Sequence, residues 1–115
     1  MKTITILLLI AIMSIGAQSL IHHLNDKNFA SKVNEAPLTL VYIYSSSCKF
    51  CKEFTPIFEK LSKNAELLKL NYSFAKIDGP LFKDTVQAFE AYSYPTIAVF
   101  FKGISLPILY RKARE

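Results

Sequence analysis

The two cysteines are the residues of this sequence best suited to chemistry. Cys48 and Cys51 are its only cysteines, and only Lys49 and Phe50 separate them. They follow the apolar run Leu38–Tyr44 and precede a segment whose apolar residues have helical spacing. A thiol at a helix N-terminus lies near unpaired N–H groups and the positive end of the helix dipole, which favour the thiolate. Because the thiolate is the form that attacks disulfides, the pattern favours a redox-active dithiol.

A structural disulfide and a metal site are the two alternatives for this pair. A zinc site would need two more ligands, for which the sequence offers His22 and His23. Adjacent residues of a strand point to opposite faces, so these histidines are poorly placed to bind one metal. We therefore expect no metal and no other cofactor, while the structural disulfide stays open as an alternative.

Composition and charge limit the classes of function. The 115 residues have room for one domain, and an apolar content of 51% predicts a packed core rather than disorder. Lys and Arg number 14 against 9 Asp and Glu, but the lysines are spread along the chain. This dispersed charge argues against a nucleic-acid partner.

The first 18 residues have the three regions of a secretory signal. Lys2 gives a positive start, Ile4–Ile15 is almost wholly apolar, and small residues follow from Gly16. We predict a signal peptide at 1–18 and one domain at 19–115. The apolar run is shorter than the ~20 residues of most membrane helices. An uncleaved anchor is the alternative, and only in that case do we expect a membrane partner.

A cleaved signal would direct the chain to the endoplasmic reticulum lumen or out of the cell. Both are oxidising compartments in which a disulfide can persist. Asn71, followed by Tyr72 and Ser73, has the form of a glycosylation sequon. That sequon has meaning only in a eukaryotic secretory pathway.

Hydrophobic spacing and turn residues predict the order βαβαβαββ. The expected strands are 20–24, 38–44, 72–77, 96–101 and 106–110. The expected helices are one that carries Phe29 and Val33, one from Cys48 through Leu61, and one at 83–91. Pro107 in the last strand places that strand at a sheet edge. The order predicts an α/β fold with a central mixed sheet and flanking helices.

These segments resemble the thioredoxin superfamily, and within it the catalytic domains of protein disulfide isomerases. The resemblance runs from about Leu20 to the end of the sequence. It is carried by Cys48–Lys52 with Pro56, Phe74–Asp78, Tyr94–Ile97 with Phe100 and Phe101, and Pro107–Tyr110 with Arg114 and Glu115. It implies a thioredoxin-like fold. Because the family fold ends in one more helix, it also implies that this sequence is a fragment or a truncated product.

The resemblance implies a role for each thiol and for the basic residues near them. Cys48 would be the exposed nucleophile and Cys51 the buried resolving thiol. Lys49 would stabilise the reduced form and make the disulfide more oxidising. Arg114 matches an arginine thought to swing toward the resolving cysteine in isomerases and tune its acidity.

A substrate-binding segment is also implied. In the family, the proline that Pro95 matches is cis and lies against the cysteine pair. The backbone just before it, here Tyr94, pairs with an incoming substrate strand. We therefore assign Tyr94, Pro95 and Thr96 to binding of polypeptide substrates that contain cysteines.

Two residues depart from the family pattern, and a third loses its partner as a result. Tyr42 stands where most members have a buried carboxylate that relays protons to the resolving thiol, and a phenol is a poor base at neutral pH. Lys76 matches the lysine that pairs with this acid, so it has lost its partner. Ser47 replaces an aromatic residue. We therefore predict an exchange activity that is present but weak.

The combined hypothesis is a thiol-disulfide oxidoreductase that acts on polypeptide cysteines. A redox-inert thioredoxin-fold module that binds unfolded or partner polypeptide is the first alternative, favoured by Tyr42 and Ser47. The second is a membrane-anchored accessory subunit held by an uncleaved Ile4–Ile15.

Overall fold

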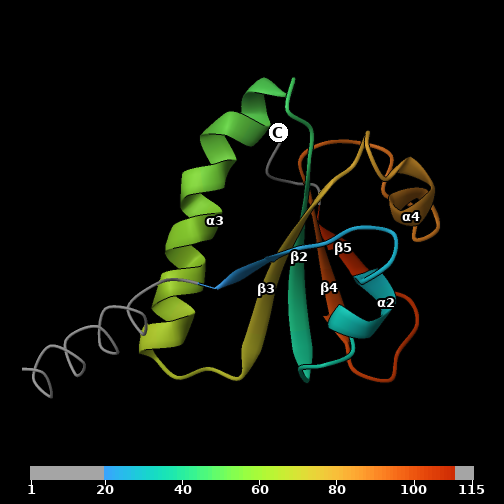
Figure 1. The fold of residues 1–115 in the computed structure, drawn as a ribbon. Coiled ribbons are helices and arrows are strands. Elements are labelled where there is room, and N and C mark those ends of the chain that lie inside the picture. Colours follow the sequence, from blue (N-terminus) through green and yellow to red (C-terminus); the bar gives the residue numbers. More distant parts are fainter. Residues whose placement is uncertain (1–19, 111–115) are drawn as a thin grey trace, which may run out of the picture.

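A five-stranded mixed β-sheet forms the centre of the molecule (Figure 1). The structure is a computed structural model that describes residues 20–110. The strands are β1 (Ile21–His23), β2 (Leu38–Tyr44), β3 (Tyr72–Asp78), β4 (Thr96–Phe101) and β5 (Ile108–Tyr110). Their spatial order is β1-β3-β2-β4-β5, so β1 and β5 are the edges. β1 and β2 run parallel to β3, whereas β4 is antiparallel to β2 and to β5. The predicted mixed sheet and the edge position of the last strand are confirmed.

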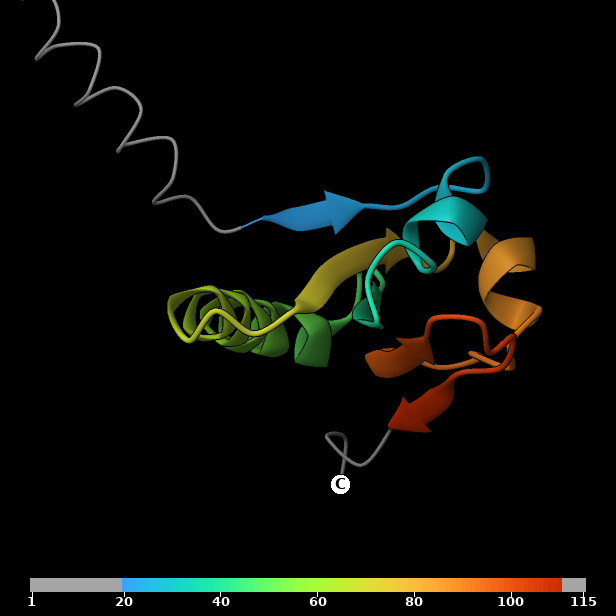
Figure 2. The ribbon, with the colours of Figure 1, turned by 90° about the horizontal axis from the view of Figure 1, so that it is seen from below.

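Helices cover both faces of the sheet (Figure 2). The long helix α3 (Lys49–Leu67) lies on one face. The short helices α2 (Phe29–Lys32) and α4 (Lys83–Gln87) lie on the other. The predicted order βαβαβαββ is therefore confirmed.

Strand β2 supplies side chains to a separate apolar core on each face. Val41 and Ile43 point into the core beneath α2 and α4. Tyr42, between them, points into the core beneath α3, where its ring packs against Phe58, which in turn packs against Phe74. Because alternate residues of a strand point to opposite faces, a central strand covered on both sides reads as a continuous apolar run. This explains the composition of Leu38–Tyr44.

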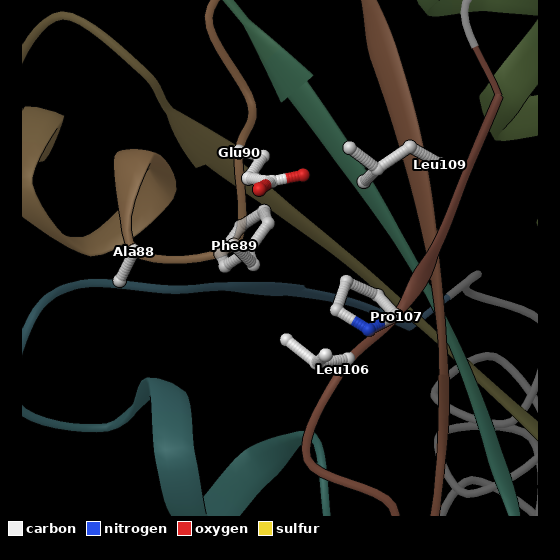
Figure 3. Close-up of a pocket in the computed structure, with 6 residues that line it drawn as sticks. All are labelled: Ala88, Phe89, Glu90, Leu106, Pro107 and Leu109. Atoms are coloured by element: carbon white, nitrogen blue, oxygen red, sulfur yellow. The ribbon is translucent and has the colours of Figure 1, made fainter.

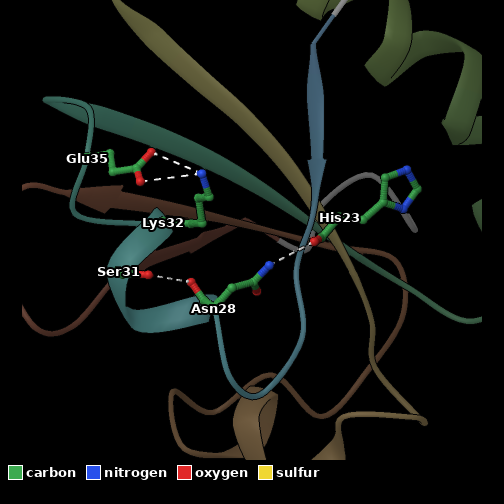
Figure 4. A network of polar contacts seen from close by, with 5 residues as sticks. All are labelled: His23, Asn28, Ser31, Lys32 and Glu35. Atoms are coloured by element: carbon green, nitrogen blue, oxygen red, sulfur yellow. Dashed lines mark hydrogen bonds and ion pairs between the residues drawn. The ribbon is translucent and has the colours of Figure 1, made fainter.

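Asn28 links the short helix α2 to strand β1 (Figure 4). The side-chain amide of Asn28 donates to the backbone carbonyl of His23 over 3.2 Å. The backbone carbonyl of Asn28 accepts a hydrogen bond from the Ser31 hydroxyl over 3.1 Å. At the other end of α2, Lys32 and Glu35 form an ion pair at 3.4 Å. A helix of one turn has little stability of its own. The bond to His23 ties α2 to the edge strand β1, whereas the other two contacts lie within α2 and the turn that follows it.

Three predicted elements are longer than the observed ones. The helix expected at 83–91 ends at Gln87, because Glu90 has a positive φ of 68° that cannot continue an α-helix. The N–H of Ala91 instead donates to the carbonyl of Val86 over 3.1 Å. The strand expected at 106–110 begins at Ile108, directly after Pro107, which has no N–H to donate to the sheet. The strand expected at 20–24 is limited to 21–23, and β3 extends one residue further, to Asp78.

A buried threonine provides a test of the core beneath α2 and α4. Thr39 is buried, and its hydroxyl has no hydrogen-bond partner. An unpaired buried hydroxyl is destabilising, so we expect Thr39→Val, which keeps the side-chain shape, to raise the free energy of unfolding by ~1 kcal/mol. Urea unfolding followed by circular dichroism measures this change. A variant less stable than the wild type would show that the Thr39 hydroxyl is hydrogen-bonded in solution.

Two predictions concern residues that the structure does not describe. The signal peptide at 1–18 and the expectation about a final helix both fall outside residues 20–110. Within those residues, none of the helices has the length and apolar character needed to cross a bilayer.

Candidate active site

The turn between β2 and α3 places Cys48 at the N-terminus of the long helix. Cys48 is the N-cap residue and has an extended backbone, with φ −86° and ψ 118°. Its N–H donates to the carbonyl of Ser45 over 3.2 Å, which closes the turn. Its sulfur accepts a hydrogen bond from the N–H of Cys51 over 3.1 Å. This backbone donor and the helix dipole are both arranged to stabilise negative charge on the Cys48 sulfur.

The two sulfurs differ in their access to solvent. Both cysteines are free thiols; Cys48 is half-buried, whereas Cys51 is only 2% exposed. Burial, together with the neighbouring Cys48 thiol, raises the pKa of Cys51 to about 11. At neutral pH Cys51 is therefore a neutral thiol enclosed behind its more accessible partner.

The hydroxyl of Tyr42 lies at the base of the cysteine pair. It donates to the carbonyl oxygen of Cys51 over 2.8 Å and lies 3.1 Å from the hydroxyl of Thr55. Thr55 itself donates to the same carbonyl over 2.9 Å. Burial raises the pKa of Tyr42 far above its usual value. The phenol therefore stays protonated and serves as a hydrogen-bond donor, in agreement with the expectation that it is a poor base.

Lys76 lies beside Tyr42 but contacts an aromatic ring. The two residues are paired in register across β2 and β3. The Lys76 ammonium lies 5.9 Å from the centre of the Tyr44 ring, a cation–π geometry. In residues 20–110 the ion pair observed is Lys32–Glu35, so no carboxylate there pairs with Lys76. The Lys76 ammonium, which would face a carboxylate if position 42 were acidic, thus contacts the Tyr44 ring instead.

Pro95 borders the helix end that carries the cysteines. The Tyr94–Pro95 peptide bond is cis, as the family resemblance implies. Pro95 lines a small pocket of about 120 Å³. The other lining residues all belong to α3 and are Phe50, Glu53, Phe54 and Ile57. Tyr94 packs against both cores of the domain. The cis-proline loop and the first two turns of α3 therefore form one surface next to Cys48.

The side chain of Thr96 has an internal role. It is fully buried, and its hydroxyl donates to the carbonyl of Ser93 over 2.7 Å. This bond fixes the loop that holds Pro95. The Thr96 side chain is therefore out of reach of a polypeptide bound at the surface.

The remaining predicted site residues lie at different distances from the thiols. Lys49 is exposed in the first turn of α3, directly after Cys48. Ser47 is exposed, and its hydroxyl lies 3.0 Å from that of Ser45. Asn71 is exposed in the turn between α3 and β3, far along the helix from the cysteines. Arg114 lies outside the described residues.

Sequence reasoning missed two residues that shape the site. Thr55 binds the Cys51 carbonyl, but a threonine inside a helical pattern gives no signal of that contact. Gly79 leaves room for the Tyr94 ring, because a Cβ built there would overlap the ring. Its position in an Asp-Gly-Pro turn and the scarcity of glycine, three in the chain, were the available signals.

A cavity on the other face of the sheet is separate from the cysteine pair. It has a volume of about 450 Å³ and lies between the segment after α4 and the loop before β5 (Figure 3). Its lining residues are Ala88, Phe89, Glu90, Leu106, Pro107 and Leu109. It contains a single titratable group, Glu90, and no thiol. In residues 20–110 no three His, Cys, Asp or Glu side chains come together as a metal site.

Comparison with known proteins identifies the family. The thioredoxin family model matches residues 20–115. The chain belongs to the thioredoxin family. The structure agrees with this match in three features. They are the mixed sheet, the Cys-x-x-Cys at the start of α3 and the cis peptide bond before Pro95.

Relatives of this thioredoxin domain include domains of protein disulfide isomerases. Protein disulfide-isomerase 2-3 of Arabidopsis thaliana is 36% identical over 101 residues, which cover 87% of this chain and 22% of that protein. Endoplasmic reticulum resident protein 44 of Mus musculus is 30% identical over 98 residues, covering 80% and 23%. The first thioredoxin domain of mouse protein disulfide-isomerase A4 has a TM-score of 0.68 at 30% identity, covering 77% of this chain and 62% of that one. The chain spans less than a quarter of these curated relatives, so the activity of the whole proteins is a proposal here.

Proposed function

We propose that this thioredoxin domain exchanges disulfides with cysteine-containing polypeptides through Cys48 and Cys51. One observation carries the proposal most directly: the accessible sulfur of Cys48 caps α3 and accepts the Cys51 N–H over 3.1 Å, with Cys51 enclosed behind it. A sulfur so placed is open to attack on a substrate disulfide and lies where a helix N-terminus and a backbone N–H favour negative charge, whereas the enclosed thiol is kept from reacting with solvent oxidants. The family membership supports a role of this type.

The proposed exchange takes place in two steps. The Cys48 thiolate attacks one sulfur of a substrate disulfide, forms a mixed disulfide and displaces the other substrate sulfur as a thiolate. Cys51 then loses its proton to water, and its sulfur attacks Cys48. The Cys48–Cys51 disulfide forms, and the second substrate sulfur leaves as a thiolate. The domain is oxidised by two electrons and the substrate disulfide is reduced; the reverse sequence oxidises a substrate dithiol.

The surroundings of Cys48 support a polypeptide substrate. We assign substrate contact to the backbone of Tyr94 and Pro95, with Thr96 holding the loop in place. Phe50, next to them, is 53% exposed and offers an apolar contact to an unfolded segment. Three basic residues are proposed to modulate the pKa values of the thiols. Lys49 adds positive charge beside Cys48, and Lys76 contributes to the electric field around the buried thiol. Arg114 stays the candidate for tuning the pKa of Cys51.

We also propose entry into the secretory pathway. The signal predicted at 1–18 supports this, and one relative is named as an endoplasmic reticulum resident protein. The domain then occupies 19–115, in the endoplasmic reticulum lumen or outside the cell. The exposed position of Asn71 is compatible with its use as a glycosylation site.

Cys48→Ser tests the proposed function. Because a serine hydroxyl is not ionised at neutral pH, we expect this variant to lose insulin-disulfide reduction by on the order of 100-fold or more. Turbidity of precipitating insulin chains, with a thiol reductant present, measures the rate. The control is Ser46→Ala, an exposed change in the same turn that removes no thiol. Equal rates for wild type and Cys48→Ser would overturn the catalytic proposal.

A redox-inert module that binds polypeptide is the second candidate. It is favoured by Tyr42, which cannot act as the proton acceptor expected of the family, and by the exposed rings of Phe50 and Tyr92. This function predicts that Cys48→Ser still binds an unfolded, cysteine-free polypeptide with wild-type affinity while wild type shows no exchange.

A further inference from the structure

One face of the first part of α3 forms a pocket beside the cysteine pair. Phe50, Phe54 and Ile57 recur at helical spacing, so they lie along the same face of the helix. Together with Glu53 and Pro95 they line the pocket of about 120 Å³. Phe50 and Ile57 are 53% and 54% exposed, so a side chain bound there would cover apolar surface that otherwise faces water.

Glu53 is the one charged residue among those that line this pocket. It is exposed, and in residues 20–110 the ion pair observed is Lys32–Glu35, so no cation there pairs with it. Lys49 stands four residues earlier on the helix, but a lysine N-terminal to a glutamate is the less favourable order for such a pair. Neither Lys49 nor Lys52 lines the pocket. The pocket therefore combines apolar walls with one negative charge that has no partner among the described residues.

These two properties match a basic side chain. Arg and Lys have an apolar stem and a charged end, so the stem can lie against apolar walls while the end reaches a carboxylate. An Arg guanidinium also stacks on aromatic rings and forms paired hydrogen bonds with a carboxylate. A purely apolar side chain would cover the same walls, but it would remove water from the carboxylate of Glu53 without giving it a partner.

The distance between Glu53 and the reacting sulfur indicates where the basic residue stands in the substrate. Glu53 lies five positions after Cys48, which corresponds to ~8 Å along the helix axis. An extended polypeptide covers ~7 Å in two residues, and side chains two residues apart point to the same side. A substrate whose cysteine faces Cys48 therefore presents the residue two positions away to the pocket.

We infer that Glu53 is a specificity-determining residue, which selects polypeptides with an arginine or lysine two residues from the cysteine that reacts with Cys48. The inference deepens the proposed function and rests on it. It adds no chemical step, because the Cys48 sulfur still attacks the substrate disulfide and Glu53 only binds the basic side chain. The expected result is a preference among substrates, measured as a ratio of exchange rates.

Short peptide disulfides test this preference. Each peptide has one cysteine joined to a nitrobenzoate thiol, and two residues before or after it stands either arginine or citrulline, its neutral analogue. The Cys48 thiolate attacks the peptide sulfur, forms a mixed disulfide with the peptide and displaces the nitrobenzoate as a coloured thiolate. With the reduced full chain in excess, we expect the arginine peptide to react about fivefold faster than the citrulline peptide in at least one position. The same ratio measured with dithiothreitol corrects for the reactivity of the peptides themselves.

Three variants assign the preference to one carboxylate. Glu53→Gln should lower the ratio to the value seen with dithiothreitol, and Glu53→Lys should reverse the preference toward a peptide with glutamate in place of arginine. Glu59→Gln is the matched control, because it makes the same charge change at an exposed glutamate farther along α3 and should keep the wild-type ratio. Equal ratios for the wild type and Glu53→Gln would overturn the inference. So would a wild-type preference for the glutamate peptide, which would show that Lys49 and Lys52 set the selectivity.

A binding measurement separates failure of this inference from failure of the proposed function. Release of nitrobenzoate no faster in the wild type than in Cys48→Ser would refute a reactive Cys48 and so the proposed function. Fluorescence anisotropy with labelled peptides that have serine in place of cysteine then tests Glu53 without any exchange. The arginine peptide should bind about fivefold more tightly than the citrulline peptide, and Glu53→Gln should remove this difference. Equal affinities in the wild type, or no binding of either peptide, would overturn the role of Glu53.

Discussion

Cys51→Ser should convert the domain into a trap for its substrates. Cys48 keeps its place at the start of α3 and can still attack a substrate disulfide, but no sulfur remains behind it to displace the substrate. Release then depends on external thiols. Because the intramolecular thiol acts at a very high effective concentration, we expect release to slow by at least ~100-fold. A cysteine-containing polypeptide should therefore accumulate as a mixed disulfide visible on a non-reducing gel and by mass spectrometry.

The double variant Cys48→Ser, Cys51→Ser controls for unspecific association, because it should trap nothing. Since Cys51 is enclosed and its pKa is raised to about 11, it should not take over the attack on the substrate in Cys48→Ser. Trapping by Cys48→Ser rather than by Cys51→Ser would reverse the roles proposed for the two sulfurs. Trapping by neither would favour the polypeptide-binding module.

The order of elements was predictable because it depends on local patterns. Leu38–Tyr44 reads as a strand buried on both faces, and the helical spacing after Cys48 predicts the helix through Leu61, although α3 continues to Leu67. The early end of α4 was not predictable in this way. Phe89 and Ala91 continue an apolar pattern, but they reach the core from a turn made by the positive φ of Glu90. An apolar pattern indicates which side chains are buried, but it does not show whether a helix or a turn carries them.

The place of the two cysteines at the start of α3 was predictable, whereas the contacts that surround them were not. Cys48, Cys51 and Pro95 follow from motifs, because a spacing of two residues at a helix start limits the geometry strongly. The loss of an acid at Tyr42 could also be read from the sequence. The contact between Tyr42 and Thr55 could not, because it depends on how α3 packs on β2, and no local pattern reports that distance. The new partner of Lys76 likewise comes from the register between β2 and β3.

Phe58→Ala should cause the largest loss of stability of any single change considered. Phe58 is 1% exposed, and its ring packs against those of Tyr42 and Phe74 with centroids 5.3 and 5.5 Å away. Removing a buried phenylalanine ring costs about 3–5 kcal/mol, through lost burial and the cavity left behind. Domains of this size have a total stability of about 5–15 kcal/mol, so most of it could be lost. Chemical unfolding followed by far-UV circular dichroism measures the change, which suits a chain without tryptophan.

Phe50→Ala is the matched control on the same helix. Its ring is 53% exposed, so we expect a change in stability of less than ~1 kcal/mol. The two variants should therefore separate the two uses of aromatic residues in α3. Phe58→Ala should loosen the ring of Tyr42 and with it the hydrogen bonds at Cys51, whereas Phe50→Ala should slow exchange with polypeptides and spare exchange with a small disulfide. Equal losses of stability in the two variants would contradict the placement of Phe58 in the core that supports Cys51.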